Sequence, residues 1–505
     1  MRENIKSRFA SKIVNNVIAL ISNMIIGLVL PRSLGPSLYG NYTLAYDMIT
    51  QTLSFLELRS FTFFYNKLSS SYKSRYLASY TLITICVIFL VGLIVGLVYF
   101  TGMDSFFLKE VPFPVALVAM AIVFQKWMLE FFSKVYDALG LTLYSENYKT
   151  LFSLVFILLT SCSLFIDQFT LGSFFALNLI AFIPLLFLLF FKFQKLEGGS
   201  LFTVYTFRFT YAPILIAVRK YCSPFLLFLI LQLILGLIDR NLLQLKRGSH
   251  EQGLYGFSIS LTNIILILIA AITPIFQREV AILNHQKNRE GLRLFYDKVV
   301  PNLFLLICYF VAFIVVNSAD VITLIGGDEY RDSRYLLVWS MISTLAACYT
   351  NFNNCVLYAT GAFGYTSKLL TYIFPISIFY SGIVIYYLDF GSIGLVIKNA
   401  ISEFTMFLLV MQFLSRTVRL NIRRHFLFLV HVFILFTLTA LFFEYLCSVF
   451  LFENVLVRLL FKGGLYTLTI VSTYLFFPAV LMIRQNFGNP IDIQRIVKIV
   501  KFKKV

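Results

Sequence analysis

The sequence predicts an all-α polytopic membrane protein with fourteen transmembrane helices. Of its 505 residues, 59% are hydrophobic and only 13% are charged, and the mean hydropathy is +0.84. Soluble domains average about 45–50% apolar and about 25% charged residues, so this composition excludes a soluble fold. The apolar residues also gather into runs of about 20, which is the length that a bilayer span requires.

Fourteen such runs follow one another along the chain, and the gaps between them are too short to hold a soluble domain. Their approximate bounds are 9–30, 40–60, 76–100, 112–136, 147–166, 169–192, 221–238, 253–277, 299–317, 333–358, 364–388, 391–414, 424–447 and 460–483. An even number of spans places both termini on the same side of the membrane.

The basic residues indicate which side that is. The chain holds 42 Lys and Arg against 24 Asp and Glu, a net charge of +18. With cytoplasmic termini, 31 of the 42 face the cytoplasm, 9 lie in outer loops and 2 lie inside spans. Because cytoplasmic loops are enriched in Lys and Arg, both termini are expected in the cytoplasm. The positive charge is therefore explained by topology, and no nucleic-acid partner is expected.

Two short motifs recur at similar spacing and predict an internal repeat. Leu-Tyr-Gly at 38–40 returns at 254–256, an offset of 216, and Ala-Leu-Gly at 138–140 returns as Ala-Thr-Gly at 359–361, an offset of 221. Both recurrences are six spans apart, which implies two lobes in the same orientation, related by a pseudo-two-fold axis along the membrane normal. The predicted parts are a six-helix lobe at 1–200, a second at 201–415, and two added helices with a basic cytoplasmic tail at 416–505.

Polar residues inside the spans mark faces that avoid lipid. In the second run, residues 43, 47, 50, 54 and 57 are all polar or charged and follow helical spacing. A charge at the bilayer centre costs about 2.5–3.5 kcal/mol. Asp47 has no basic residue one turn away within its own run, so we expect it to line a cavity or to serve as an ion-coupling site.

Four other polar residues in the spans are candidates for the same cavity. Lys126 and Glu130 share one face of the fourth run, where they could line the cavity or neutralise each other as an i,i+4 pair. Glu130 is the second ion-coupling candidate. Asn16 and Asn23 lie two turns apart in the first run. Helix-to-helix hydrogen bonding is the alternative role for such asparagines.

Three arginines lie at the ends of spans, where they would suit an anionic substrate. They are Arg32, Arg59 and Arg240. A guanidinium binds phosphate in a bidentate manner and stays charged at any relevant pH. Snorkelling at the membrane surface is the alternative role for each.

The motifs of common enzyme classes do not occur in the sequence. It contains no GxxxxGK[ST] phosphate loop, no HExxH and no CxxC, and its four histidines are dispersed. The seven cysteines lie in or beside apolar runs and suggest neither a disulfide framework nor a metal cluster. We therefore expect a transporter without a cofactor or a metal rather than an enzyme.

The segment after the first run resembles a known family. It reads LPRSLGPSLYGNYTLAYDMI at 30–49 and resembles the corresponding signature of polysaccharide-export, or O-antigen, flippases. These belong to the multidrug/oligosaccharidyl-lipid/polysaccharide export superfamily. The pair 239–240 and the segments 324–337 and 357–369 also resemble that family, and the resemblance weakens after about residue 415.

The resemblance implies a fourteen-helix, two-lobed protein of the bacterial inner membrane. Its expected activity is to move a polyprenyl-pyrophosphate-linked oligosaccharide, an O-antigen or capsule repeat unit, from the cytoplasmic to the periplasmic leaflet. Expected partners are that lipid-linked oligosaccharide, membrane lipids and other glycan-assembly proteins. Arg32 is the one site residue carried over from a family motif.

Two other functions remain open at this point. One is an antiporter of drugs or small solutes in the same superfamily, driven by protons or sodium ions through Asp47 or Glu130. The other is a membrane-embedded glycan polymerase, which the short outer loops disfavour.

Overall fold

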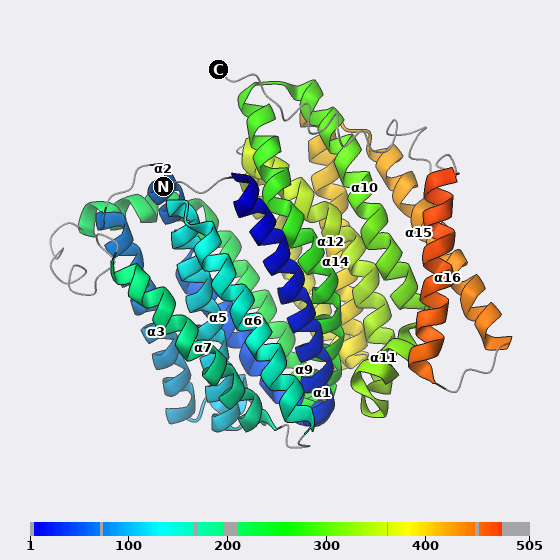
Figure 1. Ribbon diagram of the computed structural model, residues 1–505, viewed down its shortest axis with the longest axis horizontal. Coiled ribbons are helices and arrows are strands. Elements are labelled where there is room, and N and C mark those ends of the chain that lie inside the picture. The colour runs from blue at the N-terminus through cyan, green and yellow to red at the C-terminus, as the bar shows by residue number, and fades with distance from the viewer. Residues whose placement is uncertain are drawn as a thin grey trace. The chain divides into compact units, whose positions relative to one another are not determined.

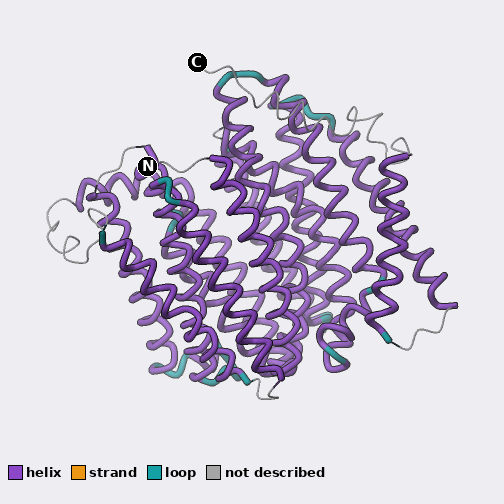
Figure 2. Tube along the Cα trace, viewed as in Figure 1, coloured by secondary structure: helices purple, strands orange, loops and turns teal. Residues whose placement is uncertain are grey.

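The computed structural model describes residues 5–70, 74–165, 170–195, 211–360, 362–449 and 454–476. In these ranges every regular element is a helix, and none is a strand (Figure 1, Figure 2). The predicted all-α class is therefore confirmed. Nine helices in the same ranges are long and apolar enough to cross a membrane, which makes this a multi-pass membrane protein. The count of fourteen spans stays a prediction.

The nine candidate spans overlap runs seen in the sequence. They are Ser74–Phe100, Phe113–Leu139, Leu171–Gln194, Leu226–Ile269, Arg289–Val316, Ser367–Ile385, Gly391–Arg416, Ile422–Ser448 and Val455–Leu475. The fourth, Leu226–Ile269, covers two predicted spans because the helix continues through a bend at Gly248.

The chain forms two compact units. Unit 1 takes its described residues from Met1–Ser260 and Ser367–Leu395, and unit 2 from Leu261–Thr366 and Val396–Val505. The lobes expected at 1–200 and 201–415 stay a prediction.

Unit 1 contains helices from the first half of the chain and two elements from the second half. They are α1 (Ile5–Glu57), α2 (Ser60–Ser70), α3 (Ser74–Phe100), α4 (Asp104–Phe107), α5 (Phe113–Leu139), α6 (Thr142–Phe165), α7 (Leu171–Gln194), the first part of α9 (Tyr211–His285), most of α13 (Phe363–Gly382) and the π-helix η2 (Ile383–Tyr387). In this unit α1 packs against α5 and α6, and α6 packs against α7.

Unit 2 contains the remaining helices. They are the end of α9, then α10 (Arg289–Val316), α11 (Ser318–Gly326), the 3₁₀ helix η1 (Asp328–Ser333), α12 (Arg334–Thr360), most of α14 (Gly391–Thr417), α15 (Ile422–Val449) and α16 (Val455–Phe476). In this unit α10 packs against α12 and α15, and α15 packs against α16.

Two glycines bend the helices that were expected to be separate spans. Inside α1, Gly35 has φ 69° and ψ 167°, and inside α9, Gly248 has φ 77° and ψ −175°. A side chain is strongly disfavoured in this region of φ and ψ, so glycine is needed at both positions. The runs 9–30 and 40–60 are consequently two arms of one bent helix, and so are 221–238 and 253–277.

The two bends bring α1 and α9 into very close contact. A methyl group on Gly40 would overlap the carbonyl oxygen of Ser249, and a methyl group on Gly253 would overlap the carbonyl oxygen of Pro36. The two contacts are equivalent, because Ser249 lies 213 residues after Pro36 and Gly253 lies 213 residues after Gly40. The bend glycines show the same offset, since Gly248 lies 213 residues after Gly35. These helices therefore cross about a local two-fold axis.

The residue offset between the two repeats at this crossing differs from the offset predicted from the sequence. The Leu-Tyr-Gly match gave an offset of 216, but the contacts at the crossing give 213, which differs by about one helical turn. Because equivalent faces recur nearly every turn, a three-letter match cannot separate the two registers. In the structure Gly256, the glycine of the second motif, lies against the side chain of Thr43.

The second repeat anchor has the same hydrogen bond at both of its sites. Leu141 N donates to Tyr136 O at 2.8 Å at the end of α5, and Ala362 N donates to Leu357 O at 2.9 Å at the end of α12. This six-residue closure is typical of a helix that ends in a left-handed residue, and Gly140 has φ 80°. Gly361 lies outside the described residues. The offset of 221 is confirmed for this hydrogen bond.

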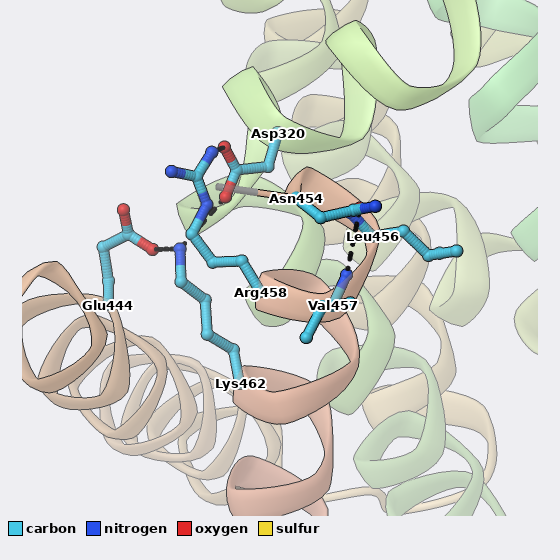
Figure 3. A network of polar contacts seen from close by, with 7 residues as sticks. All are labelled: Asp320, Glu444, Asn454, Leu456, Val457, Arg458 and Lys462. Carbon is cyan, nitrogen blue, oxygen red and sulfur yellow. Dashed lines mark hydrogen bonds and ion pairs between the residues drawn. The ribbon is translucent and has the colours of Figure 1, made fainter. Parts of the chain in front are cut away.

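In unit 2, charged residues join α16 to α11 and α15 (Figure 3). Asp320, in the first turn of α11, bonds Arg458 and lies 3.0 Å from Lys462 Nζ, and Glu444 of α15 also bonds Lys462. The Lys462 side chain is only 3% exposed. A buried ammonium needs paired carboxylates, and these two meet that need.

Candidate functional site

The central feature of the candidate site is an ion pair between α1 and α9 in unit 1. Arg240 Nη2 donates a hydrogen bond to Asp47 Oδ2. The Arg240 side chain is 9% exposed and that of Asp47 is 31% exposed. Both residues were candidates from the sequence, and the structure brings them together. The basic partner that Asp47 lacks within its own helix is supplied by another helix.

Aromatic and hydroxyl groups surround this pair. The Arg240 guanidinium lies 4.5 Å from the centre of the Tyr255 ring, a cation–π contact. The Tyr39 hydroxyl lies 2.9 Å from Ser260 Oγ and is near enough to both charges to interact with them electrostatically. Sequence reasoning did not assign Tyr39, Tyr255 or Ser260 to the site. The signal was present, because both tyrosines belong to the repeated Leu-Tyr-Gly motif.

Several buried polar atoms of α1 and α9 have no hydrogen-bond partner among the described residues. They are Arg240 Nη1, Gln51 Oε1, and both side-chain polar atoms of Gln252. Gln51 lies one turn after Asp47, and a methyl group on Gly236, one turn before Arg240, would overlap its amide. The packing of α1 on α9 is therefore tight, yet it leaves polar groups unsatisfied. Such groups are rare in native interiors and each needs an explanation.

Lys126 and Glu130 do not form the pair that their spacing allowed, so that alternative is wrong. Lys126 Nζ donates to the Tyr46 hydroxyl at 3.1 Å and lies 4.9 Å from the centre of the same ring. Glu130 instead bonds Lys134 at 2.7 Å and is 57% exposed. Lys126 thus contacts the residue next to Asp47. Glu130 pairs with Lys134, one turn further along α5.

The other predicted arginines lie apart from the pair. Arg32 is exposed, three residues before the bend at Gly35. Arg59 has φ 58° in the break after α1, and its guanidinium lies 5.7 Å from the centre of the Phe228 ring. About ten helical residues separate Asp47 from the end of α1, which is about 15 Å. Arg59 therefore lies too far along the axis of α1 to belong to the ion-pair site.

The side chains of the two predicted asparagines, Asn16 and Asn23, lie outside the described residues. Their neighbour Asn15 is buried and donates to Glu146 Oε2 at 2.6 Å. Lys149 Nζ lies 3.7 Å from the other oxygen of Glu146 and donates to Ser133 Oγ at 2.6 Å. The polar stripe of the fourth run therefore binds α5 to α6 at Ser133, as inter-helix hydrogen bonding predicts.

A second polar network joins the two bends to the loop before α5. Asn41 donates to Glu110 O at 2.9 Å, and Gln244 donates to Lys109 O at 2.8 Å. Ser249 N, next to the bend in α9, donates to Glu110 Oε2 at 3.0 Å. These contacts lie on the side that the basic residues predict to be outer, and they hold both bends against one loop.

The same side carries a further contact from α9 to the start of α14. Arg247 lies 3.1 Å from Asp389 Oδ1 and 3.5 Å from Glu251 Oε2. Glu251 Oε1 accepts hydrogen bonds from Ser392 N at 2.7 Å and from Ser392 Oγ at 2.8 Å. The carboxylate thus occupies the positive end of a helix, which favours it electrostatically. Together the two networks link α1, α9 and the start of α14 on this side of unit 1.

In the described ranges no group of three or more His, Cys, Asp or Glu residues could hold a metal ion. The site offers a fixed ion pair, an aromatic ring and hydrogen-bonding groups. A buried guanidinium beside an aromatic ring can bind an anion, and an aspartate that shares it can exchange with that anion.

Solved structures of transporters share this fold. The lipid II flippase MurJ in an inward closed conformation has a TM-score of 0.65 at 14% identity, covering 92% of this chain and 98% of that one. The Vibrio cholerae MATE transporter VcmN has 0.55 at 17%, covering 81% and 97%. An inward-facing multidrug resistance MATE transporter of the MOP superfamily has 0.54 at 14%, covering 80% and 94%. No family model and no curated protein matches the chain. The likeness to these three structures is one of fold.

Proposed function

We propose that the protein is a flippase of the bacterial inner membrane. It moves a polyprenyl-pyrophosphate-linked oligosaccharide, an O-antigen or capsule repeat unit, from the cytoplasmic to the periplasmic leaflet by alternating access. The observation that carries the proposal is the buried Arg240 between two bent helices. Its guanidinium keeps an Nη1 that has no hydrogen-bond partner in the part of the chain that the structure describes. The likeness of the fold to a lipid flippase over 92% of the chain supports it.

The charge of the substrate accounts for the residues at the site. A pyrophosphate carries several negative charges and needs paired donors, and arginine satisfies such groups in a bidentate manner. Arg32, exposed before the bend in α1, would make a first contact with the headgroup, and Arg240 would hold it within the unit. In this proposal both termini face the cytoplasm, and other glycan-assembly proteins supply and consume the lipid-linked sugar.

An ion-coupled antiporter of drugs or small solutes is the second candidate. The likeness of the fold to two MATE transporters favours it, and Asp47 or Glu130 would bind the coupling proton or sodium ion. Both carboxylates have a basic partner in this structure. Coupling would therefore need the ion to compete with that partner.

Deleting the gene and measuring lipid-linked repeat units distinguishes the two candidates. The flippase predicts that these units accumulate on the cytoplasmic face and that surface glycan falls, and that wild-type protein restores both. Arg240→Gln should fail to restore them even after the result is corrected for the amount of protein that reaches the membrane. Unchanged surface glycan in the deletion strain, together with lost ethidium efflux, would overturn the flippase and support the antiporter.

A further inference from the structure

We infer that Asp47 is an internal competitor for the substrate's pyrophosphate at Arg240. Its carboxylate occupies the guanidinium while the site is closed, and the incoming headgroup displaces it. This inference rests on the proposed function, because it assumes that Arg240 binds the substrate anion. It adds a regulatory role for Asp47, which neither the sequence pattern nor the fold assigns.

The exposure of the two partners indicates which of them can leave. Arg240 is 9% exposed and Asp47 is 31% exposed. The guanidinium is also held by the Tyr255 ring at 4.5 Å. Displacing the carboxylate therefore moves the less buried of the two groups, whereas moving the guanidinium would break its contact with the ring. The anion site stays in place while its occupant changes.

The ion pair with Asp47 uses only part of the hydrogen-bonding capacity of the Arg240 guanidinium. Only Nη2 donates to Asp47, and Nη1 is buried without a partner among the described residues. A phosphate can accept hydrogen bonds from two guanidinium nitrogens at once. The pyrophosphate therefore gains a donor that Asp47 leaves idle, and this difference allows displacement of a carboxylate that is already bound.

The interface between α1 and α9 holds buried polar groups that opening it would satisfy. Gln51 Oε1 and the Gln252 side chain are buried without hydrogen-bond partners in the described part of α1 and α9. Leaving a polar group in that condition costs about 1–3 kcal/mol. Opening the interface to water or to a sugar headgroup would remove that cost. The same opening would give the substrate access to Arg240.

Competition also makes release easier. Once displaced, Asp47 keeps its negative charge close to the bound pyrophosphate, and like charges repel. When the headgroup departs, the carboxylate returns to the guanidinium. An arginine without this competitor would hold the headgroup more tightly and release it more slowly, so Asp47 limits affinity in favour of turnover.

Native mass spectrometry of the purified full-length protein, titrated with undecaprenyl pyrophosphate, tests the inference. Asp47→Asn should bind this lipid about tenfold more tightly if Asp47 occupies Arg240 for about nine-tenths of the time. Asp47→Glu, which keeps the charge, should bind like the wild type. Arg240→Gln, alone or combined with Asp47→Asn, should bind weakly. Asp389→Asn, which breaks another aspartate–arginine pair at an exposed position, is the matched control and should leave binding unchanged.

The outcomes separate the inference from the function on which it rests. Weaker binding by Arg240→Gln, with no gain in Asp47→Asn, would overturn the competition and leave the flippase proposal standing. Unchanged binding by Arg240→Gln would remove Arg240 from the site and overturn both. A parallel titration with inorganic pyrophosphate identifies the ligand. If Asp47→Asn binds both probes more tightly than the wild type, the ligand group recognised is the pyrophosphate itself. If it binds only the lipid more tightly, the group recognised is the pyrophosphate attached to its lipid. Either result supports the competition.

Discussion

Arg240 donates a hydrogen bond to Asp47 across two helices, although 193 residues separate them in the sequence. Each belongs to an arm of a helix that bends at a glycine, Gly35 in α1 and Gly248 in α9. The bends turn both helices so that their glycine faces cross, and the ion pair lies beyond the crossing. The charge arrangement at the candidate site thus depends on two backbone positions that carry no side chain.

Removing one partner of this pair should be worse for stability than removing both. Arg240→Gln leaves Asp47 without its basic partner in a mostly buried place, which we expect to cost about 1–3 kcal/mol of unfolding free energy. Adding Asp47→Asn should recover most of that loss, because two amides can hydrogen-bond. Thermal unfolding of the purified variants measures this. Transport, in contrast, should stay lost in the double variant, and recovery of transport would argue against a role for the guanidinium.

The helix crossing should not tolerate a methyl group. Gly40→Ala would place its Cβ against the backbone of Ser249, and backbone cannot turn aside as a side chain can. Overpacking of this kind costs about 1–3 kcal/mol, so we expect a lower melting temperature and less protein in the membrane. Gly92→Ala, in α3 with no atom within 4 Å of the added carbon, is the matched control. Equal stability of the two variants would contradict the close crossing.

In unit 2, Asp320 should matter more than Glu444. Asp320 is 14% exposed and bonds both Arg458 and Lys462, whereas Glu444 is 42% exposed and bonds Lys462 alone. Asp320→Asn therefore leaves two cations short of a partner, and we expect it to lower the melting temperature clearly more than Glu444→Gln. A larger effect of the glutamate variant would mean that α15, rather than α11, is the main support of α16.

The predicted orientation can be measured by labelling with a membrane-impermeant maleimide. His250 and Lys287 are both exposed, and the topology places them on opposite sides of the membrane. Cysteine at 250 should react in intact cells, and cysteine at 287 only after the membrane is permeabilised. The wild type is the background control, because its seven cysteines lie in or beside apolar runs. The reverse pattern would place the termini outside.

Part of the candidate site was visible in the sequence because of the cost of charge in lipid. Asp47, Lys126, Glu130 and Arg240 stood out as charged residues in or beside apolar runs, and two of them form the central ion pair. Their partners were harder to predict. Helical spacing favoured Lys126 with Glu130, but Lys126 instead reaches Tyr46 of α1. Spacing identifies neighbours on one helix, and it carries no information about the helix that packs against it.

The sequence by itself determined the fold class, because 59% hydrophobic residues in runs of bilayer length leave no soluble alternative. It also indicated an internal repeat. Only the tertiary structure decided the register of the helix crossing and the pairing of Asp47 with Arg240. The physical reason is that hydrophobicity is a property of each residue and its periodicity. A contact between distant helices depends on how bent backbones pack, which no local pattern encodes.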